Sequence, residues 1–400
     1  MVEAEALSPA DLRRQIGRTV RVAGRVLAID AAGIVLADAL GCADISLAAL
    51  PSEVAVGDFV VVVGSVHSAG SLREAHISER HAGSTPRGDT DFGRFCLEGV
   101  GRALQQRSAA FAAIRAYFAE NSFIEVDAPF LVPAPGLDSF VTPVRCGAEY
   151  LATSPEFQLK RLLAGGLPRL YALGHVARED EAGPWHEREF CMLEWYRAFA
   201  GADAIRADTE QLVRRVAACF GSAEVATLHD GRRIHLEVPF ARLTVREAFR
   251  KWAGVSDAAL LAEQDEAEYF QCFVDRIEPA LAQLDRPVFL EQYPASQAAL
   301  SRLLPDDPSV AERVELYLGG IELANGFVEL TDPVEQRRRF EAERIRRNDP
   351  AIPFDERFLA ALGAGMPPCT GIALGVDRLI ALCAGQAAIQ PVVPFPRHWL

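Results

Sequence analysis

The chain has 400 residues, of which 50% are hydrophobic and 24% charged, a composition typical of a soluble globular protein with two or three domains. Its longest notable apolar run, residues 59–63, is far shorter than the ~20 residues that a membrane helix needs. The formal net charge of −14 opposes nucleic-acid binding through the overall field, so a contact with tRNA would need a local basic patch.

Residues 16–78 alternate apolar and polar side chains in short runs broken by glycine, which predicts a small all-β barrel. Residues 1–90 contain 8 Arg against 11 Asp plus Glu, and Phe59 is the only aromatic residue in strand-like sequence. Such a surface suits the stacking of bases poorly. An RNA-reading module, a dimer-supporting or interaction module, and a purely structural barrel all remain open.

The chain after the barrel is rich in Gly, Ser, Thr, Pro and charge, so we expect a barrel at 1–85, a linker at 86–100 and a second domain at 101–400. Helical spacing predicts a helix over 103–120, and 123–129 is typical of a strand stopped by proline. Next, Ser154 and Pro155 suit the N-cap and first turn of a helix, with Glu156 in that turn. A carboxylate at Glu156 could also hold an ammonium group.

Residues 174–196 join two strand-like runs through a highly charged loop, which could be only a solvated hairpin. Arg178 enters the loop and Phe190 leaves it, a pair that suits ATP: the guanidinium would neutralise charge on the α-phosphate and the ring would stack on adenine. Glu194 and Tyr196 lie two apart on a strand, so both could line one pocket.

Glu315 and Glu322 flank the Gly319-Gly320 pair, which favours a hairpin that brings the two carboxylates together. Mg²⁺ bridging phosphates prefers such oxygen ligands. Beyond the turn, alternating polar and aromatic residues at 325, 327 and 329 predict one face that offers an amide, a wall and a carboxylate to a cationic side chain.

Residues 369–382 predict an apolar strand that runs into a helix with Asp377 and Arg378 in its first turn. Arginine at a helix start opposes the helix dipole, at a cost of up to ~1 kcal/mol. That placement makes sense if Arg378 faces a phosphate, while Gly375 lets a nucleotide approach closely.

These segments together resemble the three signature motifs of class II aminoacyl-tRNA synthetases, at 123–129, 178–196 and 371–378. The phrases TSPEFQLKRLL, FCMLEWYR, YPASQAAL and GMPPCTGIALGVDRL are similar to the elongation factor P lysyltransferase family, a paralogue of lysyl-tRNA synthetase. The resemblance implies an α+β catalytic domain, an antiparallel sheet flanked by helices, behind an OB-like barrel. It also implies ATP, Mg²⁺, lysine or (R)-β-lysine as substrate, elongation factor P as acceptor, and a homodimer.

The resemblance implies roles for particular positions. Arg178 and Arg378 would be catalytic. The amino acid would contact Ser154, Glu156, Tyr196, Asn325, Phe327, Glu329 and Ala373; ATP would contact Arg178, Glu179, Asp180, Glu187, Phe190, Glu322, Leu323, Gly375 and Arg378; and Glu315 with Glu322 would bind the metal. Ala373 favours the lysyltransferases, because lysyl-tRNA synthetases usually have glycine at that place.

Three departures from the family qualify this expectation. The usual His-Asn-Pro-Glu-Phe loop appears here with Glu187 and Arg188 in place of Asn and Pro, residues 133–140 differ from either relative, and the N-terminal module is an addition. A lysyl-tRNA synthetase with a reduced anticodon module and a non-catalytic regulator are the alternatives. Eight cysteines without a metal-ligand spacing, and an acidic rather than basic N-terminus, predict reduced thiols in a cytoplasmic protein without a zinc site.

Overall fold

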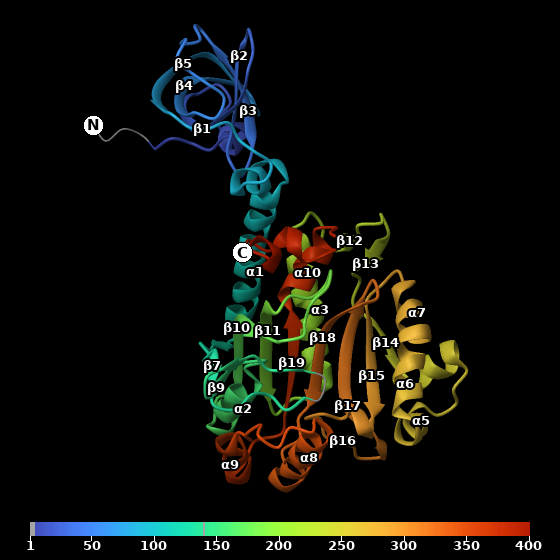
Figure 1. Cartoon of the computed structure of the whole chain (residues 1–400). Coiled ribbons are helices and arrows are strands. Elements are labelled where there is room, and N and C mark those ends of the chain that lie inside the picture. Colours follow the sequence, from blue (N-terminus) through green and yellow to red (C-terminus); the bar gives the residue numbers. More distant parts are fainter. Residues whose placement is uncertain (1–4, 139–140) are drawn as a thin grey trace. The chain divides into compact units, whose positions relative to one another are not determined.

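The computed structural model describes residues 5–138 and 141–400, so positions 139 and 140 of the divergent segment 133–140 lie outside the described residues. The chain divides into two compact units, one of residues 1–108 with 391–394 and one of residues 109–390 with 395–400 (Figure 1). Each unit is described by itself, and the predicted domain limits at 85 and 100 stay predictions.

The first unit is built on a closed five-stranded barrel, as the alternation of its sequence predicts. Its strands are β1 (Thr19–Ile29), β2 (Gly33–Ala37), β3 (Cys42–Leu47), β4 (Phe59–Ser68) and β5 (Ser71–His81), joined in the order β1-β2-β3-β5-β4 after a short 3-10 helix (Pro9–Arg14). Alternate side chains point inward because successive residues of a strand face opposite sides. Val22, Leu36, Val62 and Leu72 fill the centre with no exposed surface.

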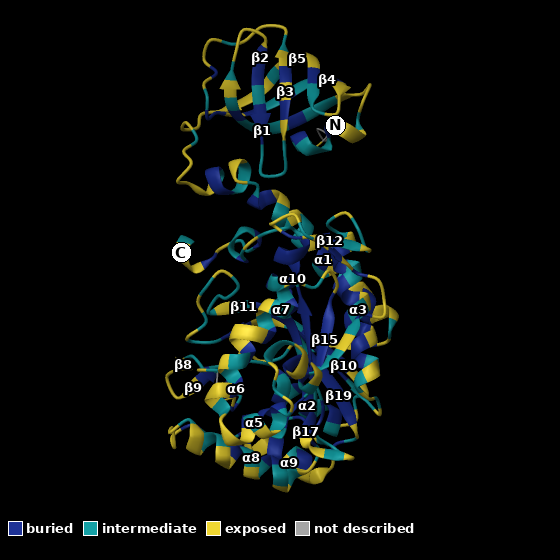
Figure 2. Ribbon diagram, turned by 90° about the vertical axis from the view of Figure 1, so that its right-hand side faces the viewer, coloured by how far each residue is buried: buried dark blue, intermediate teal, exposed yellow. Residues whose placement is uncertain are grey.

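The second unit contains a nine-stranded sheet. Its strands run in the order β14 (Ala241–Thr244), β15 (Val288–Pro294), β17 (Asp307–Leu318), β18 (Ile321–Val328), β19 (Cys369–Gly375), β11 (Glu189–Ala198), β10 (Arg169–Ala177) and β6 (Ile124–Glu125), with β16 (Leu303–Leu304) paired to β17. The inner pairs are antiparallel, and the outermost pairs, β14 with β15 and β6 with β10, are parallel. Figure 2 shows that these strands are largely buried.

Helices flank this sheet. They are α1 (Val100–Glu120), α2 (Glu156–Ala164), α3 (Ala202–Ala218), α4 (Val245–Ala248), α5 (Ala258–Gln264), α6 (Glu266–Cys272), α7 (Glu278–Ala282), α8 (Pro333–Arg346), α9 (Glu356–Ala364) and α10 (Val376–Cys383). Helices α3 and α10 pack on each other and against the central strands β11, β18 and β19. Two small sheets complete the unit, β7 (Leu131–Val132) with β9 (Glu149–Leu151) and β8 (Arg145–Cys146), and β12 (Val225–Thr227) with β13 (Arg233–His235). A search of the described helices finds none with the length and apolarity to span a membrane.

The predicted hairpin between the two candidate metal-binding acids is confirmed. Gly319 (φ 61°) and Gly320 (φ 88°) both take left-handed conformations, as a two-residue turn between antiparallel strands requires. The turn sets the register that places Glu315 opposite Asn325 and Tyr317 opposite Glu322. Glu315 and Asn325, which lie on opposite sides of the turn, therefore share one face of the sheet.

Two local predictions need correction. The strand expected over 123–129 is reduced to β6, because only Leu170 and Tyr171 of β10 pair with it and the chain then leaves the sheet toward Pro129. Helix α2 begins at Glu156 rather than at Pro155, which takes the cap position instead. Ser154 still supports the helix start, since its hydroxyl accepts the backbone N–H of Glu156 at 3.0 Å.

Candidate active site

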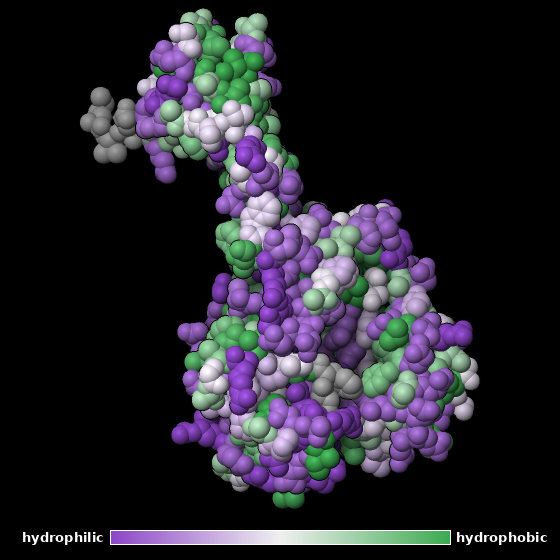
Figure 3. All heavy atoms as spheres, in the orientation of Figure 1, coloured by the Kyte–Doolittle hydropathy of each residue, from purple (hydrophilic) through white to green (hydrophobic). Residues whose placement is uncertain are grey.

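One cavity of about 470 Å³ lies in the second unit, over the middle of the large sheet. Its floor is formed by β11, β18 and β19, and its walls by the start of α2, the loop of residues 178–190, the first turn of α10 and one side of α8. Figure 3 shows a hollow in this unit surrounded mainly by hydrophilic residues. The cavity is large enough for an amino acid together with a nucleotide.

Most residues singled out in the sequence meet at this cavity. It is lined by Ser154, Glu156, Arg178, Glu187, Phe190, Tyr196, Glu322, Leu323, Asn325, Phe327, Ala373, Gly375 and Arg378. Four other candidates are described but do not line it: Glu179, Asp180, Glu315 and Glu329. Strand register accounts for much of the convergence, because Ala373 lies opposite Glu194 on one side and Asn325 on the other.

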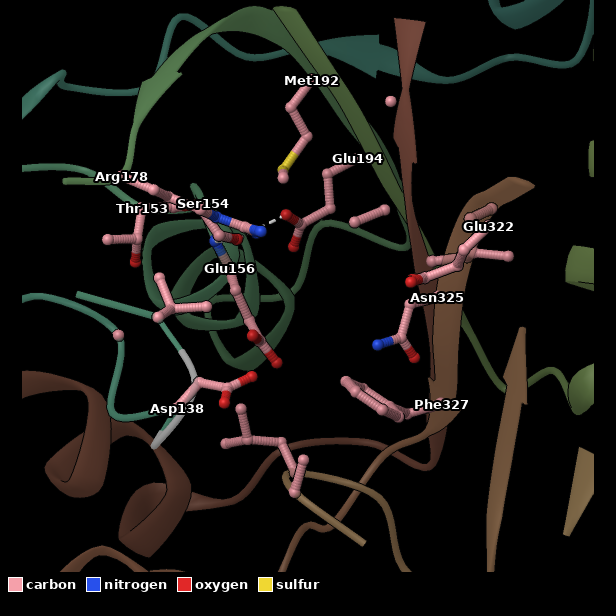
Figure 4. A pocket seen from close by; sticks show the side chains of 18 of the residues that line it. Asp138, Thr153, Ser154, Glu156, Arg178, Met192, Glu194, Glu322, Asn325 and Phe327 are labelled. Atoms are coloured by element: carbon pink, nitrogen blue, oxygen red, sulfur yellow. Dashed lines mark hydrogen bonds between the residues drawn. The ribbon is translucent and has the colours of Figure 1, made fainter. Parts of the chain in front are cut away.

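The carboxylate of Glu194 projects into one part of the cavity from β11 (Figure 4). Ser154 Oγ donates to Glu194 Oε2 at 2.6 Å, and the Tyr196 hydroxyl donates to Glu194 Oε1 at 2.6 Å. Burial, together with the nearby charge of Glu156, raises the pKa of Glu194 to about 7. A buried acid in this state gains from a cationic partner, so this part of the cavity favours an ammonium group.

A lysine sits beside this acid, behind the cavity wall. Lys160 Nζ lies 2.5 Å from Glu156 Oε1 and 2.5 Å from Glu329 Oε2, with only 1% of the lysine side chain exposed. Glu329 is fully buried, and apart from the ion pair of its Oε2 with Lys160 its carboxylate has no hydrogen-bond partner in the described part of the chain. Burial raises the pKa of Glu329 to about 8 even though Lys160 acts in the opposite direction. Three carboxylates, at 156, 194 and 329, thus share one small region with a single lysine.

Another part of the cavity presents two arginines. Arg378 is held by the backbone oxygens of Trp185 at 3.1 Å and Glu322 at 2.9 Å, and its Nη2 lies 2.6 Å from His186 Nε2. Arg178 contacts the Thr153 carbonyl at 3.4 Å.

Arg178 also packs over the Phe190 ring, 5.2 Å from its centroid, and lies 3.4 Å from a carboxylate oxygen of Glu181. Two fixed guanidinium groups facing one space favour an anionic ligand such as a phosphate.

The loop of residues 178–190 contains Glu187 and Arg188, which differ from the family pattern. Arg188 forms an ion pair with Glu179, and the Glu187 carboxylate accepts Gln390 Nε2 at 3.1 Å. The backbone N–H of Arg178 donates to the Arg188 carbonyl at 2.8 Å, which closes the base of the loop. The acid and arginine that differ from the family pattern therefore take part in holding the loop's own conformation.

The acids expected to bind a metal occupy different positions. Glu322 lines the cavity, whereas Glu315 does not line it and accepts Tyr317 OH at 2.7 Å and Arg313 Nη2 at 2.6 Å. Burial and then the charge of Glu315 raise the pKa of Glu322 to about 7, although Arg378, Arg313 and Arg178 act in the opposite direction. Carboxylate oxygens suit Mg²⁺, so Glu322 fits as a direct ligand and Glu315 as a supporting charge.

Among the described residues, no group of three or more His, Cys, Asp or Glu side chains is arranged to hold a metal by itself. A magnesium ion here would need further oxygen ligands from water or from a bound nucleotide.

Several lining residues were not singled out in the sequence. The most informative are Asp138, Glu181, His186 and Arg313. Arg313 is fixed by Asn325 Oδ1 at 3.2 Å and the Gln297 carbonyl at 2.8 Å. Its position two residues before Glu315 on one strand was a usable signal, because such residues share a face. Asp138 carried no such signal, since a loop brings it to the cavity (Figure 4).

Comparison with known proteins agrees with this arrangement. The family described as tRNA synthetases class II (D, K and N) matches residues 93–399. A protein of Vibrio cholerae named elongation factor P--(R)-beta-lysine ligase is 41% identical over 308 residues, covering 73% of this chain and 94% of that protein. Its namesake from Proteus mirabilis is 39% identical over 310 residues with the same coverage. The chain belongs to the class II (D, K and N) tRNA synthetase family, within the group of elongation factor P--(R)-beta-lysine ligases.

Proposed function

We propose that this protein activates (R)-β-lysine, or lysine, with ATP as an aminoacyl adenylate and passes the acyl group to a lysine side chain of elongation factor P. The observation that carries the proposal is a single cavity with buried acids in one part and two arginines in another. A diamino acid has ammonium groups for the acids, which leaves its carboxylate free to meet the α-phosphate of ATP. The names of the relatives supply the substrate and the acceptor.

The first step needs no nucleophilic side chain. An oxygen of the substrate carboxylate attacks the α-phosphorus, the bond to the bridging oxygen breaks, and pyrophosphate leaves with the electron pair. Arg178 and Arg378 stabilise the negative charge that builds up on the phosphate oxygens. Phe190 stacks on the adenine, with Glu187, Leu323 and Gly375 around the nucleotide and Glu179 and Asp180 supporting its loop.

The amino end is held by the acids. Glu156 with Ser154 binds one ammonium group, and Glu194 with Tyr196 binds the distal one, with the charge of Glu329 behind the cavity wall. Asn325, Phe327 and Ala373 form the wall between these ends and set the length of the substrate. Mg²⁺ would neutralise charge at the phosphates, and Glu322 with Glu315 would hold it.

In the second step the uncharged amine of the acceptor lysine attacks the carbonyl carbon of the adenylate. An amide bond forms, the bond between the carbonyl carbon and the phosphate oxygen breaks, AMP leaves with the electron pair, and the amine nitrogen gives up one proton to solvent. The proposal includes a homodimer, since class II enzymes commonly pair through the segment at 123–129, and a cytoplasmic location, where reduced cysteines are expected.

A second candidate is the charging of tRNA, favoured by one feature, the N-terminal barrel. We rank it second because Phe59 is the only strand aromatic that an OB-like surface could offer in residues 1–90, and because Ala373 follows the lysyltransferase pattern. The family match begins at residue 93, so it leaves the barrel strands outside.

The test is pyrophosphate exchange into ATP with purified protein and Mg²⁺. We expect exchange that depends on lysine or β-lysine, and a loss of about 10³-fold in Arg378→Ala, which removes a charge aimed at the reacting phosphate. Arg357→Ala on α9 is the matched control, because this arginine is exposed and lies outside the cavity lining. Absence of exchange with every amino acid offered would refute the activity.

A further inference from the structure

Lys160 is one of only two lysines in the chain, against 39 arginines. The other, Lys251, is exposed beside Trp252, with Nζ 4.9 Å from the ring centroid. A chain that uses arginine almost everywhere else has retained a lysine at its most buried cationic position. Size gives a physical reason: a compact ammonium fits between two carboxylates 2.5 Å away on either side, whereas a planar guanidinium is larger and needs a forked arrangement of acceptors.

The contacts of Lys160 join two elements that form the amino end of the cavity. Glu156 stands one helical turn before Lys160 on α2, and the lysine stem runs back toward the helix start to reach it. Glu329 follows the end of β18 and comes from a distant part of the sequence. The ammonium therefore ties one glutamate at the cavity wall to another behind it.

Charge balance gives this contact a consequence. The three glutamates carry three negative charges when ionised, and Lys160 neutralises one of them, which leaves two for a ligand. Although burial disfavours its charge, Glu156 and Glu329 raise the pKa of Lys160 above its ordinary value, so the lysine stays protonated at every pH at which the protein would work. Its neighbour Glu329, with a pKa of about 8, depends on that charge to ionise.

We propose that Lys160 is a positioning residue that fixes Glu156 and Glu329 as an ionised pair and sets the charge of the amino end to accept two ammonium groups. This inference rests on the proposed function, and it explains how the charge of the site would select an amino acid with two ammonium groups. Each glutamate places one oxygen against Lys160: Glu156 also lines the cavity and can contact the substrate, whereas Glu329 lies behind the wall and contributes its buried charge to the amino end. A monoamino acid would leave one buried negative charge unpaired, which is costly.

The kinetic test compares Lys160→Met with Lys251→Met in pyrophosphate exchange. Methionine keeps the length of the side chain and removes its charge, so Glu156 and Glu329 lose the cation that holds them in place. We expect the KM for lysine to rise at least about tenfold in Lys160→Met, the energetic equivalent of one pKa unit, with the KM for ATP nearly unchanged in the fraction of protein that is folded. Lys251→Met should behave as wild type. An unchanged KM for lysine, or equal losses toward lysine and ATP, would overturn the proposal.

Addition of small molecules to a Lys160→Ala variant distinguishes the effect of the lost charge from the effect of the lost side-chain volume. Lys160→Ala should regain affinity for lysine when ethylammonium is added, but not when ethanol is added, because only the former restores a cation. Equal effects of the two additives would show that Lys160 merely fills space, and no rescue by ethylammonium would also count against a role as a counter-ion.

A readout without activity keeps this inference apart from the proposed function. Protein labelled with ¹⁵N at lysine Nζ should give two signals, which the Lys251→Met variant assigns. We expect the Lys160 signal to remain that of an ammonium at a pH at which an exposed lysine loses its proton, and to shift when lysine is added. Joint titration of both lysines would refute the ion-pair role, even if wild-type protein proved inactive. Inactive wild type with the expected signals would instead refute only the proposed activity.

Discussion

Replacing Gly371 by alanine tests how tightly the sheet holds the amino end of the cavity. Gly371 lies on β19 directly opposite Tyr196 of β11. A Cβ built on Gly371 would lie 2.2 Å from Cε1 and 2.3 Å from Cδ1 of the Tyr196 ring, far inside van der Waals contact. The ring must therefore move, and its hydroxyl, now 2.6 Å from Glu194 Oε1, moves with it.

The size of the effect follows from these two changes. Overpacking of a buried site costs typically 1–3 kcal/mol, and leaving a buried acid without one of its donors costs about 1–3 kcal/mol. Because the two terms belong to one side chain they do not simply add, and we expect a loss of about 3 kcal/mol in the free energy of unfolding. Since Tyr196 and Glu194 both line the amino end, the KM for lysine should rise while the KM for ATP changes little.

Gly174→Ala is the matched control. Gly174 lies on the adjacent strand β10, and a Cβ there would meet no atom within 4 Å. Urea unfolding of both variants measures stability, and pyrophosphate exchange measures the two KM values. If Gly371→Ala were as stable as Gly174→Ala and bound lysine normally, the packing of Tyr196 against β19 would not hold the site as described.

Two further predictions follow from the same strands. Ala373→Gly removes one methyl group between Glu194 and Asn325. The ratio of kcat/KM for α-lysine to kcat/KM for β-lysine should rise by about tenfold, the discrimination expected of one methyl-sized group. An unchanged ratio would show that Ala373 does not determine which of the two amino acids is preferred. Glu194→Gln should remove a pH dependence of stability: the folded pKa of about 7 exceeds the ordinary 4.5, so the stability linked to this group is fully present below pH 4.5 and is lost as pH rises through 7. Urea unfolding should show wild type losing up to about 3 kcal/mol relative to Glu194→Gln between pH 4.5 and 8, and a constant difference would contradict the raised pKa.

The fold was largely predictable because its signals are local. Alternation over 16–78 predicts strands, and a closed barrel is the arrangement that buries one face of each of them. The Gly319-Gly320 pair predicts its hairpin, since few other residues accept two successive left-handed conformations. The segment at 123–129 misled because a strand needs a partner as well as a sequence, and only Leu170 and Tyr171 provide one.

The candidate site was predictable where it follows strand periodicity and not where tertiary structure intervenes. Asn325 and Phe327 share a face of β18 and both line the cavity. Glu329 follows the end of that strand and does not line the cavity, and its carboxylate forms an ion pair with Lys160. The sequence shows only that lysine is scarce, and only the folded chain shows that Lys160 lies between two acids.

The acceptor assay tests the central claim most directly. Labelled lysine or β-lysine, ATP and Mg²⁺ are incubated with the protein and either elongation factor P or tRNA, and the label is followed into each macromolecule. We predict an amide-linked label on a lysine of elongation factor P that resists mild alkali, and no stable label on tRNA. Alkali-labile label on tRNA, with elongation factor P unmodified, would contradict a protein lysyltransferase and identify the enzyme as a tRNA-charging synthetase.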